Sequence, residues 1–399
     1  MNAMSRSEPP AALGAPPLFP EGLPLARPAV LDVETAMKRM GDSLASGMFT
    51  NGPLVRQLEE RAAAYLGVRH CVAVGSCTAG LMLMLRAADV AGDVLVPSFT
   101  FAATAHAVVW NGLRPVFVDI RPDTLTLSVE ACQRAIDMRT SAILATHIFG
   151  TPADVEGLER VAEEAGIRMF FDAAHAFGSQ HQGRMVGTFG DAEVFSLSPT
   201  KVLVAGEGGL ITTNDDLLAE RCRMGRDYGH PGDYDCRLIG LNGRMSEFHA
   251  AVGLGSFEDL EERLDERETL AAAYRTALED LPGITFPFVR EGDRSTIKDM
   301  TILLDNQAFG IGADDLGRAL AAEGIETKRY YSPPVHTMHA YRSLGTRWNP
   351  LDVTNDVAAR TLTVPLWSGM GTERVEKVAR AIRRSRALAG REGTQDEVS

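Results

Sequence analysis

The chain has 399 residues, of which 45% are hydrophobic and 23% are charged, a composition typical of a globular protein with a large core. Its 53 acidic and 40 basic residues give a net charge of −13, and no basic run is interleaved with aromatic residues, so nucleic-acid binding is not expected. No apolar run is long enough to span a bilayer, and we expect no membrane partner.

The N-terminal segment, residues 1–28, is rich in proline and small residues and is predicted to form a mobile or extended arm. It lacks the charged start and apolar core of a signal peptide. The cysteines are Cys71, Cys77, Cys132, Cys222 and Cys236. Their odd number and the lack of a CxxC pair fit a reducing compartment, so we expect a cytoplasmic protein.

From residue 31 to 67 the pattern is helical, with a turn at residues 50–53, and short apolar segments then alternate with amphipathic ones. The predicted strands are 71–74, 94–96, 116–119, 142–145, 169–172, 193–196 and 208–213. The predicted helices between them are 78–88, 102–110, 129–136 and 155–165. Short apolar strands separated by amphipathic helices predict an α/β fold with a mostly parallel sheet covered on both faces.

After residue 214 the pattern changes to charged helices and fewer strands. Helices are predicted at 217–223, 246–256, 258–281, 313–323 and 372–389, and strands at 284–288 and 299–304. The basic side chains of the last helix are interpreted as a solvated surface. We predict an arm at 1–28, a large cofactor-binding domain at 29–258, a small C-terminal α+β domain at 259–390 and a polar tail at 391–399.

Polar and aromatic side chains follow four of the predicted strands. In strand order they are Thr78; Phe101; Asp172 with His175; and Ser196, Ser198 and Lys201. In an open α/β sheet, ligands bind beyond the carboxyl ends of the strands. We therefore expect these side chains to surround one site.

This set of groups matches the needs of pyridoxal 5'-phosphate (PLP), which requires an amine for its aldehyde, an acid for its ring nitrogen, a flat face and phosphate donors. A buried lysine such as Lys201 favours the neutral amine, which attacks a carbonyl to form a Schiff base. Taken singly, Lys201 could be a loop lysine, Asp172 or Thr78 a helix cap, and Phe101 a core residue. Their coincidence at one sheet edge favours the cofactor.

A metal site is a second use for some of these residues. Asp172, His175 and His181 are residue types that bind zinc. Because no further ligand motif accompanies them, we expect no metal.

Long segments of the chain resemble the DegT/DnrJ/StrS family of sugar aminotransferases, which have the type I fold of PLP enzymes. The resemblance runs from about residue 51 to 255 and more weakly to about 367. The segments that carry it are TNGPLVRQLEE, GSCTAGLML, VPSFTFAATAHAV, ILATHIFG, FDAAHAFGS, FSLSPTK, GEGG and GLNGRMSEFHAAVGL. It implies a seven-stranded, mostly parallel sheet in the large domain and a smaller C-terminal α+β domain.

The resemblance implies a role for each candidate at the cofactor ring. Lys201 would form the Schiff base, and Asp172 would pair with the ring nitrogen. Phe101 would stack on the ring, and His175 would lie near the ring hydroxyl. The family often has glutamine where this chain has His175.

The same resemblance implies the phosphate and substrate contacts. Cys77, Thr78 and Ser196 would lie at the phosphate, although the family more usually has glycine in place of Cys77. Asn242 resembles the residue that reaches the phosphate of the neighbouring subunit, which implies an obligate homodimer. The segment RYYSPPVHTMHAY resembles the substrate-side loop. Its candidate substrate residues are Tyr330, Tyr331 and His336.

The implied activity is transfer of the amino group of L-glutamate to a nucleotide-linked keto sugar. PSFTFAATAHAVVW and FDAAHAFG most resemble enzymes that aminate C4 of dTDP-4-keto-6-deoxyglucose; C3 keto-sugar and aminocyclitol aminotransferases are alternatives. Relatives with histidine in place of the lysine are dehydratases, so Lys201 favours transamination over a PLP-dependent lyase or dehydratase. A catalytically silent sugar-nucleotide-binding regulator is the non-enzyme alternative, and the lack of an appended DNA-binding module argues against it.

Overall fold

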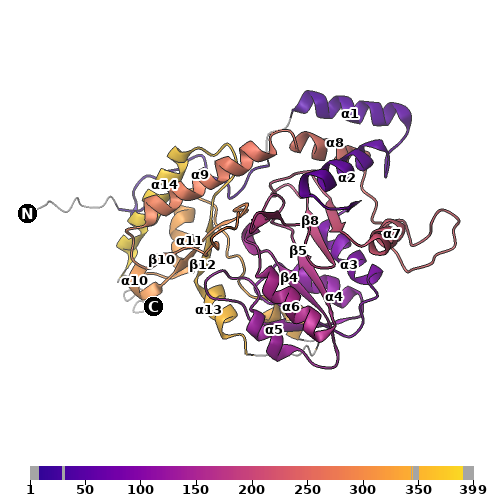
Figure 1. Ribbon diagram of the computed structural model, residues 1–399. Coiled ribbons are helices and arrows are strands. Elements are labelled where there is room, and N and C mark those ends of the chain that lie inside the picture. Colours follow the sequence, from indigo (N-terminus) through magenta and orange to yellow (C-terminus); the bar gives the residue numbers. More distant parts are fainter. Residues whose placement is uncertain (1–8, 29–31, 343, 345–349, 390–399) are drawn as a thin grey trace, which may run out of the picture.

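The computed structural model describes residues 9–28, 32–342, 344 and 350–389, and Figure 1 shows two sheets side by side. The predicted tail at 391–399 and the first residues of the predicted arm lie outside this range. The helices are α1 (Val33–Ser46), α2 (Pro53–Leu66), α3 (Cys77–Ala87), α4 (Ala102–Trp110), α5 (Val129–Ala135), α6 (Val155–Ala165), α7 (Asp216–Gly225), α8 (Glu247–Ser256), α9 (Leu260–Leu278), α10 (Asn306–Phe309), α11 (Ala313–Ala322), α12 (His339–Arg342), α13 (Asp352–Arg360) and α14 (Thr372–Ser385). Within the described residues, none of the helices is long and apolar enough to cross a membrane.

The larger sheet has seven strands. Across the sheet they are β1 (His70–Val74), β9 (Gly209–Thr213), β8 (Ala192–Ser196), β5 (Arg168–Asp172), β4 (Thr140–Thr146), β2 (Asp93–Pro97) and β3 (Arg114–Val118). Strand β9 is antiparallel to β1 and β8, and the remaining neighbours are parallel. The predicted seven-stranded, mostly parallel sheet is confirmed, and the carboxyl ends of β1, β2, β4, β5 and β8 meet at one edge.

Helices cover both faces of this sheet because its strands are apolar on both sides. Alternate residues of one strand point to opposite faces, so Cys71 and Ala73 pack in one core cluster while Val72 and Val74 pack in another. The first cluster is shared with α2, α5, α6 and α8, and the second with α3, α4 and α7. The result is a three-layer arrangement with the sheet in the middle.

The smaller sheet is antiparallel and consists of β10 (Ile284–Thr285), β11 (Met300–Leu304) and β12 (Thr361–Val364). Side chains from α9, α11 and α14 complete its core. Helix α9 packs on both cores, with Leu264 in the core of the large sheet and Leu270 in that of the small sheet (Figure 1). A domain boundary at residue 258 or 259 stays a prediction, since this helix is shared.

Three expectations differ from the observed fold. The described part of the N-terminal segment is not free, because Leu23 lies in the small-sheet core and the Ala11 amide donates to Glu323 Oε1 at 2.9 Å. Strand β10 is shorter than the predicted 284–288. On α14, Arg384 is not a solvated residue: it is 5% exposed and pairs with Glu323, which is fully buried.

Candidate functional site

A cavity of about 320 Å³ lies at the edge where the carboxyl ends of the parallel strands meet. Its lining includes the predicted residues Cys77, Thr78, Phe101, Asp172, His175, Ser196, Lys201, Tyr330 and Tyr331. The predicted residues Asn242 and His336 do not line it. The order of the strands explains this convergence, since β1, β2, β5 and β8 end at the same edge.

Lys201 lies in the connection between β8 and β9. Backbone hydrogen bonds close this connection, from Leu197 N to Gly208 O at 2.9 Å and from Ala205 N to Leu197 O at 2.8 Å. Burial, and next the positive charge of Lys298, lower the pKa of Lys201 from 10.5 to about 8. Lys201 is therefore more readily neutral than a surface lysine, as a nucleophilic amine must be.

Asp172 is the last residue of β5 and is only 3% exposed. Its Oδ1 accepts a hydrogen bond from Ala174 N at 3.1 Å, and its Oδ2 accepts one from the Thr104 hydroxyl at 2.7 Å. Burial raises the pKa of Asp172, while these two bonds and the charge of Lys201 act in the opposite direction. A turn and not a helix follows Asp172, so a helix-capping role for it is excluded.

A chain of threonine hydroxyls extends from Asp172 to the cavity. Thr104 Oγ1 lies 2.9 Å from Thr100 Oγ1, which lies 3.2 Å from Thr146 Oγ1. Thr100 and Thr146 line the cavity, whereas Thr104 is fully buried behind it. The Thr104 hydroxyl holds the carboxylate, and the other two hydroxyls support Thr104 in turn. These threonines were not predicted as site residues, because threonine is common in apolar strands and helices.

The N-terminus of α3 forms another part of the wall. Ser76 is its N-cap and accepts a hydrogen bond from Ala79 N at 3.1 Å, so the alternative of Thr78 as the cap is wrong. The backbone N–H groups of Cys77 and Thr78 have no acceptor among the described residues. Unpaired N–H groups at the first turn of a helix suit an anion.

Two further groups shape this anion-binding end. Burial raises the pKa of the Cys77 thiol well above its usual value, so the thiol stays neutral and does not repel a phosphate. A Cβ at Gly209 would lie 2.8 Å from Cys77 N, which explains why β9 has glycine where it passes this turn. The Ser196 and Ser198 hydroxyls lie 3.4 Å apart on the same wall.

The aromatic residues of the cavity have different surroundings. Phe101 is 62% exposed, so it is not a core residue and its ring is available for stacking. Tyr331 is buried and stacks on Phe149 at 6.1 Å between ring centroids. Tyr330 lies beside the ammonium of Lys298, which is 5.6 Å from its ring centre.

His175 enters the cavity as a neutral imidazole. Burial, with the charges of Lys201 and Lys298, lowers its pKa well below the usual value. Its Nδ1 accepts a hydrogen bond from Phe149 N at 3.1 Å, so the ring proton lies on Nε2. His175 can therefore donate a hydrogen bond to a ligand in the cavity.

The two predicted residues outside the cavity have other places. Asn242 is exposed on a segment that contacts the turn before α3, where Gly75 N donates to Gly243 O at 2.8 Å. His336 is only 7% exposed, and its Nδ1 lies 2.6 Å from the Ser98 hydroxyl. His336 therefore anchors its loop to the end of β2, and its place beside the sugar stays a prediction.

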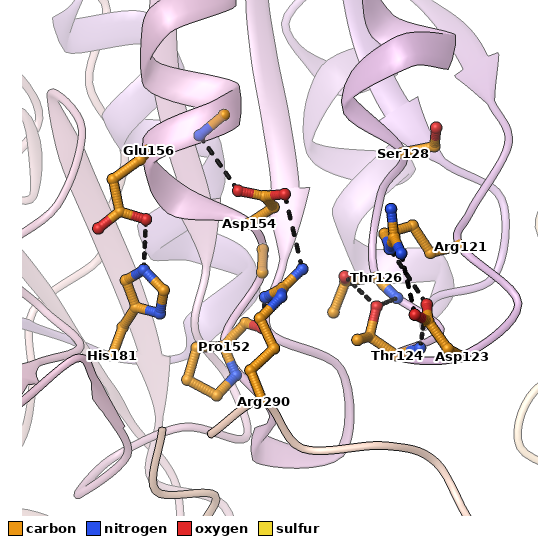
Figure 2. Close-up of polar contacts among 12 residues, drawn as sticks. Arg121, Asp123, Thr124, Thr126, Ser128, Pro152, Asp154, Glu156, His181 and Arg290 are labelled. Carbon is orange, nitrogen blue, oxygen red and sulfur yellow. Dashed lines mark hydrogen bonds and ion pairs between the residues drawn. The ribbon is translucent and has the colours of Figure 1, made fainter. Parts of the chain in front are cut away.

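His181 is engaged elsewhere, with both ring nitrogens paired to carboxylates. Its Nε2 lies 2.5 Å from Glu156 Oε2, a contact that Figure 2 shows, and its Nδ1 lies 2.7 Å from Asp293 Oδ1. His181 does not line the cavity that holds Asp172 and His175. Asp172, His175 and His181, the residues considered above for a metal site, therefore do not line one common cavity.

Lys298 lines the cavity and was not singled out as a site residue from the sequence. The available signal was the scarcity of lysine, since the chain has only Lys38, Lys201, Lys298, Lys328 and Lys377. Glu207, in the segment GEGG, also reaches the cavity from the connection that carries Lys201.

Comparisons with known proteins agree on one family. The family model described as the DegT/DnrJ/EryC1/StrS aminotransferase family matches residues 31–383. The solved structure of DesI in the presence of its TDP-sugar product is 39% identical, with a TM-score of 0.90, and the match covers 95% of this chain and 97% of that one.

The names of two relatives state different sugar substrates. The dTDP-4-amino-4,6-dideoxy-D-glucose transaminase of Escherichia coli is 31% identical, and the match covers 90% of this chain and 98% of the relative. The UDP-N-acetyl-3-dehydro-alpha-D-glucosamine 3-aminotransferase of Acidithiobacillus ferrooxidans is 35% identical, and the match covers 87% of this chain and 92% of the relative. The nucleotide and the aminated carbon therefore vary among proteins that are similarly related to this chain.

Proposed function

Because the chain belongs to the DegT/DnrJ/EryC1/StrS aminotransferase family, we propose that its cavity binds PLP and transfers the amino group of L-glutamate to a nucleotide-linked keto sugar. The chain is a transaminase of the sugar-nucleotide class. The observation that supports the cofactor most strongly is that Lys201 and Asp172 line the same cavity as the unpaired N–H groups of α3.

The donors and acceptors of the cavity fit PLP part by part. Lys201 supplies the amine for the aldehyde, and Asp172 the acid for the ring nitrogen. Phe101 offers a flat face, and His175 a donor for the ring hydroxyl. The phosphate would bind the α3 N-terminus, with hydroxyls from the residues Thr78 and Ser196.

When bound, PLP supplies an electron-withdrawing ring that makes a proton on the neighbouring substrate carbon acidic. Asp172 keeps the ring nitrogen protonated, because its buried carboxylate is held by Thr104 and Ala174. Lys201 Nζ, with a pKa of about 8, would move the proton from Cα of the amino donor to the cofactor carbon that carries the nitrogen. In the second half-reaction it would move a proton from that cofactor carbon to the sugar carbon that becomes aminated.

For the acceptor we propose C4 of dTDP-4-keto-6-deoxyglucose. The names of the Escherichia coli relative and of the DesI structure support a TDP-linked sugar, while the Acidithiobacillus relative supports C3 amination as the alternative. A comparison of kcat/KM for the dTDP-4-keto sugar and a UDP-3-keto sugar distinguishes the two. A higher value for the 3-keto sugar would remove the C4 assignment.

We also propose that the protein is a homodimer whose second copy completes the cavity. The exposed apolar side chains support this proposal: Phe101 at the cavity and Val33, Met37 and Leu44 on α1 are each at least 60% exposed. Asn242 would reach the phosphate of the partner's cofactor. Analytical ultracentrifugation tests this proposal, and a monomer with full activity would contradict it.

The absorbance spectrum of the purified protein with and without L-glutamate tests the activity. A near-visible band that bleaches with glutamate supports transamination. A band that is indifferent to glutamate indicates the lyase or dehydratase. The lack of any band after incubation with PLP would indicate a silent sugar-nucleotide-binding protein instead.

A further inference from the structure

Lys298, the second lysine of the cavity, has no part in the chemistry assigned to Lys201. It lies just before β11 and is only 7% exposed. Its ammonium donates to Asp299 Oδ1 at 2.7 Å, which is the only side-chain acceptor it has among the described residues. Two of its three N–H groups are therefore available to a ligand.

The backbone around Lys298 is held firmly. The buried guanidinium of Arg267 donates to the carbonyls of Thr296, Ile297 and Lys298, at 3.2, 2.9 and 2.7 Å. Ile297 has a φ of +45°, a conformation that is unfavourable for a β-branched residue. Strained backbone of this kind persists where surrounding contacts fix it, and it is frequent at functional sites.

The pairing of Lys298 with Asp299 keeps a cation in the cavity that would otherwise be costly to bury. Asp299 Oδ1 is occupied by Lys298, so the carboxylate orients the ammonium. Phe149 O accepts a hydrogen bond from Lys298 N at 2.8 Å and fixes the main chain. The arrangement presents an oriented positive charge in the cavity that contains Lys201.

We propose that Lys298 binds a carboxylate of the amino donor. The proposal rests on the proposed transaminase function, in which one cavity accepts an amino acid and then a keto sugar. Only the amino acid carries a carboxylate near the reacting carbon, whereas the sugar ring presents neutral hydroxyls there. Among the described lining residues, Lys298 is the one cationic side chain besides Lys201, and Lys201 is committed to the cofactor.

Lys298→Gln separates this role from the sugar half-reaction, because its amide can still donate to Asp299 but carries no charge. Each half-reaction of the PLP-loaded protein is followed separately by absorbance. The half-saturation concentration of L-glutamate should rise roughly 10- to 100-fold, the loss expected for a charge-assisted hydrogen bond. The half-saturation concentration of the keto sugar should change by less than about threefold, within the spread of an unrelated substitution.

Isothermal titration calorimetry with glutarate, a dicarboxylate that has no amine and cannot react, gives a readout that does not depend on turnover. Glutarate should bind Lys298→Gln roughly 10- to 100-fold more weakly than the unchanged protein, while glutaramide, its neutral analogue, should bind both alike. Lys377→Gln is the matched control, because Lys377 pairs with Glu373 on the surface of α14. The control should bind glutarate like the unchanged protein.

Three results with Lys298→Gln would overturn the proposal. The first is unchanged binding of glutarate and glutamate, and the second is a defect confined to the reaction with the keto sugar. The third is an equal fall in the rates of both half-reactions with no change in either half-saturation concentration. If the unchanged protein does not react with glutamate, the proposed function fails, and glutarate binding still tests Lys298. Circular dichroism and the cofactor band report folding. If Lys298→Gln does not fold, the double variant with Asp299→Asn neutralises both partners and should show the same glutarate defect.

Discussion

The cavity has two walls of different construction. The sheet wall, residues 76–78, 101, 172 and 196–201, lies at the ends of regular strands and at one helix N-terminus. The C-terminal wall, made of Lys298, Tyr330 and Tyr331, lies on irregular backbone that Arg267 and Phe149 hold in place. This difference suits a division of roles under the proposed function, in which the sheet wall would hold the cofactor and the C-terminal wall would recognise substrates.

The largest expected effect is that of Lys201→Ala on the sheet wall. Turnover should fall by roughly 10³-fold or more, because both the covalent attachment and the proton carrier are lost. The protein should still fold, since the Lys201 side chain lines the cavity and belongs to none of the core clusters. Steady-state kinetics with circular dichroism measure both, and activity within tenfold of the unchanged protein would refute the role of Lys201.

Asp172→Asn should have the next largest effect. The amide cannot hold the ring nitrogen protonated, so we expect turnover to fall roughly 10²-fold, in the range for loss of one well-placed electrostatic group. The absorbance band of the bound cofactor should also shift. As the control, Asp216→Asn removes a carboxylate that is exposed on α7 and should leave both readouts unchanged.

Thr104→Val tests the support behind the sheet wall. The substitution keeps the shape and removes the hydroxyl that donates to Asp172 Oδ2, so the pKa of Asp172 should rise further. We expect roughly a tenfold loss of turnover, matching one hydrogen bond to a charged group. An unchanged rate together with an unchanged cofactor spectrum would show that the hydroxyl chain is only structural.

The smallest expected effect is the influence of Lys298, on the C-terminal wall, on the pKa of Lys201, on the sheet wall. Because the pKa of Lys201 is lowered to about 8, its amine becomes neutral as the pH rises through 8 and not through 10.5. The rate at which cofactor-free protein captures PLP should therefore rise with pH and level off above that value. In Lys298→Gln, removal of a neighbouring positive charge should move the midpoint to higher pH. Stopped-flow absorbance measures it, and a midpoint that does not move would show that the two lysines act independently.

The sheet wall was predictable from the sequence because parallel topology forces the ends of β1, β2, β5 and β8 to one edge. Lys201, Asp172 and Thr78 could be placed there without knowing any distance. On the C-terminal wall, Tyr330 and Tyr331 were expected only through the family resemblance. Lys298 was missed, since it follows Ile297 in a left-handed conformation that no periodic pattern signals.

Other errors have similar physical reasons. His336 was expected in the cavity because of its loop, but it lies outside the cavity lining, where its imidazole pairs with the Ser98 hydroxyl in a buried position. Its place beside the sugar stays a prediction. Strand β12 escaped prediction because its four residues follow directly on α13 with no turn before them, and it forms through its pairing with β11. The N-terminal segment looked free because its prolines suppress regular structure, yet Leu23 supplies a side chain to a core that is distant in sequence.

Chemical trapping of the Schiff base identifies which lysine binds the cofactor. The PLP-loaded protein is reduced with borohydride and digested, and the modified peptide is sequenced by mass spectrometry. We expect the pyridoxyl group on Lys201, with Lys298 unmodified. A pyridoxyl group on Lys298, or on no lysine of the cavity, would contradict that expectation.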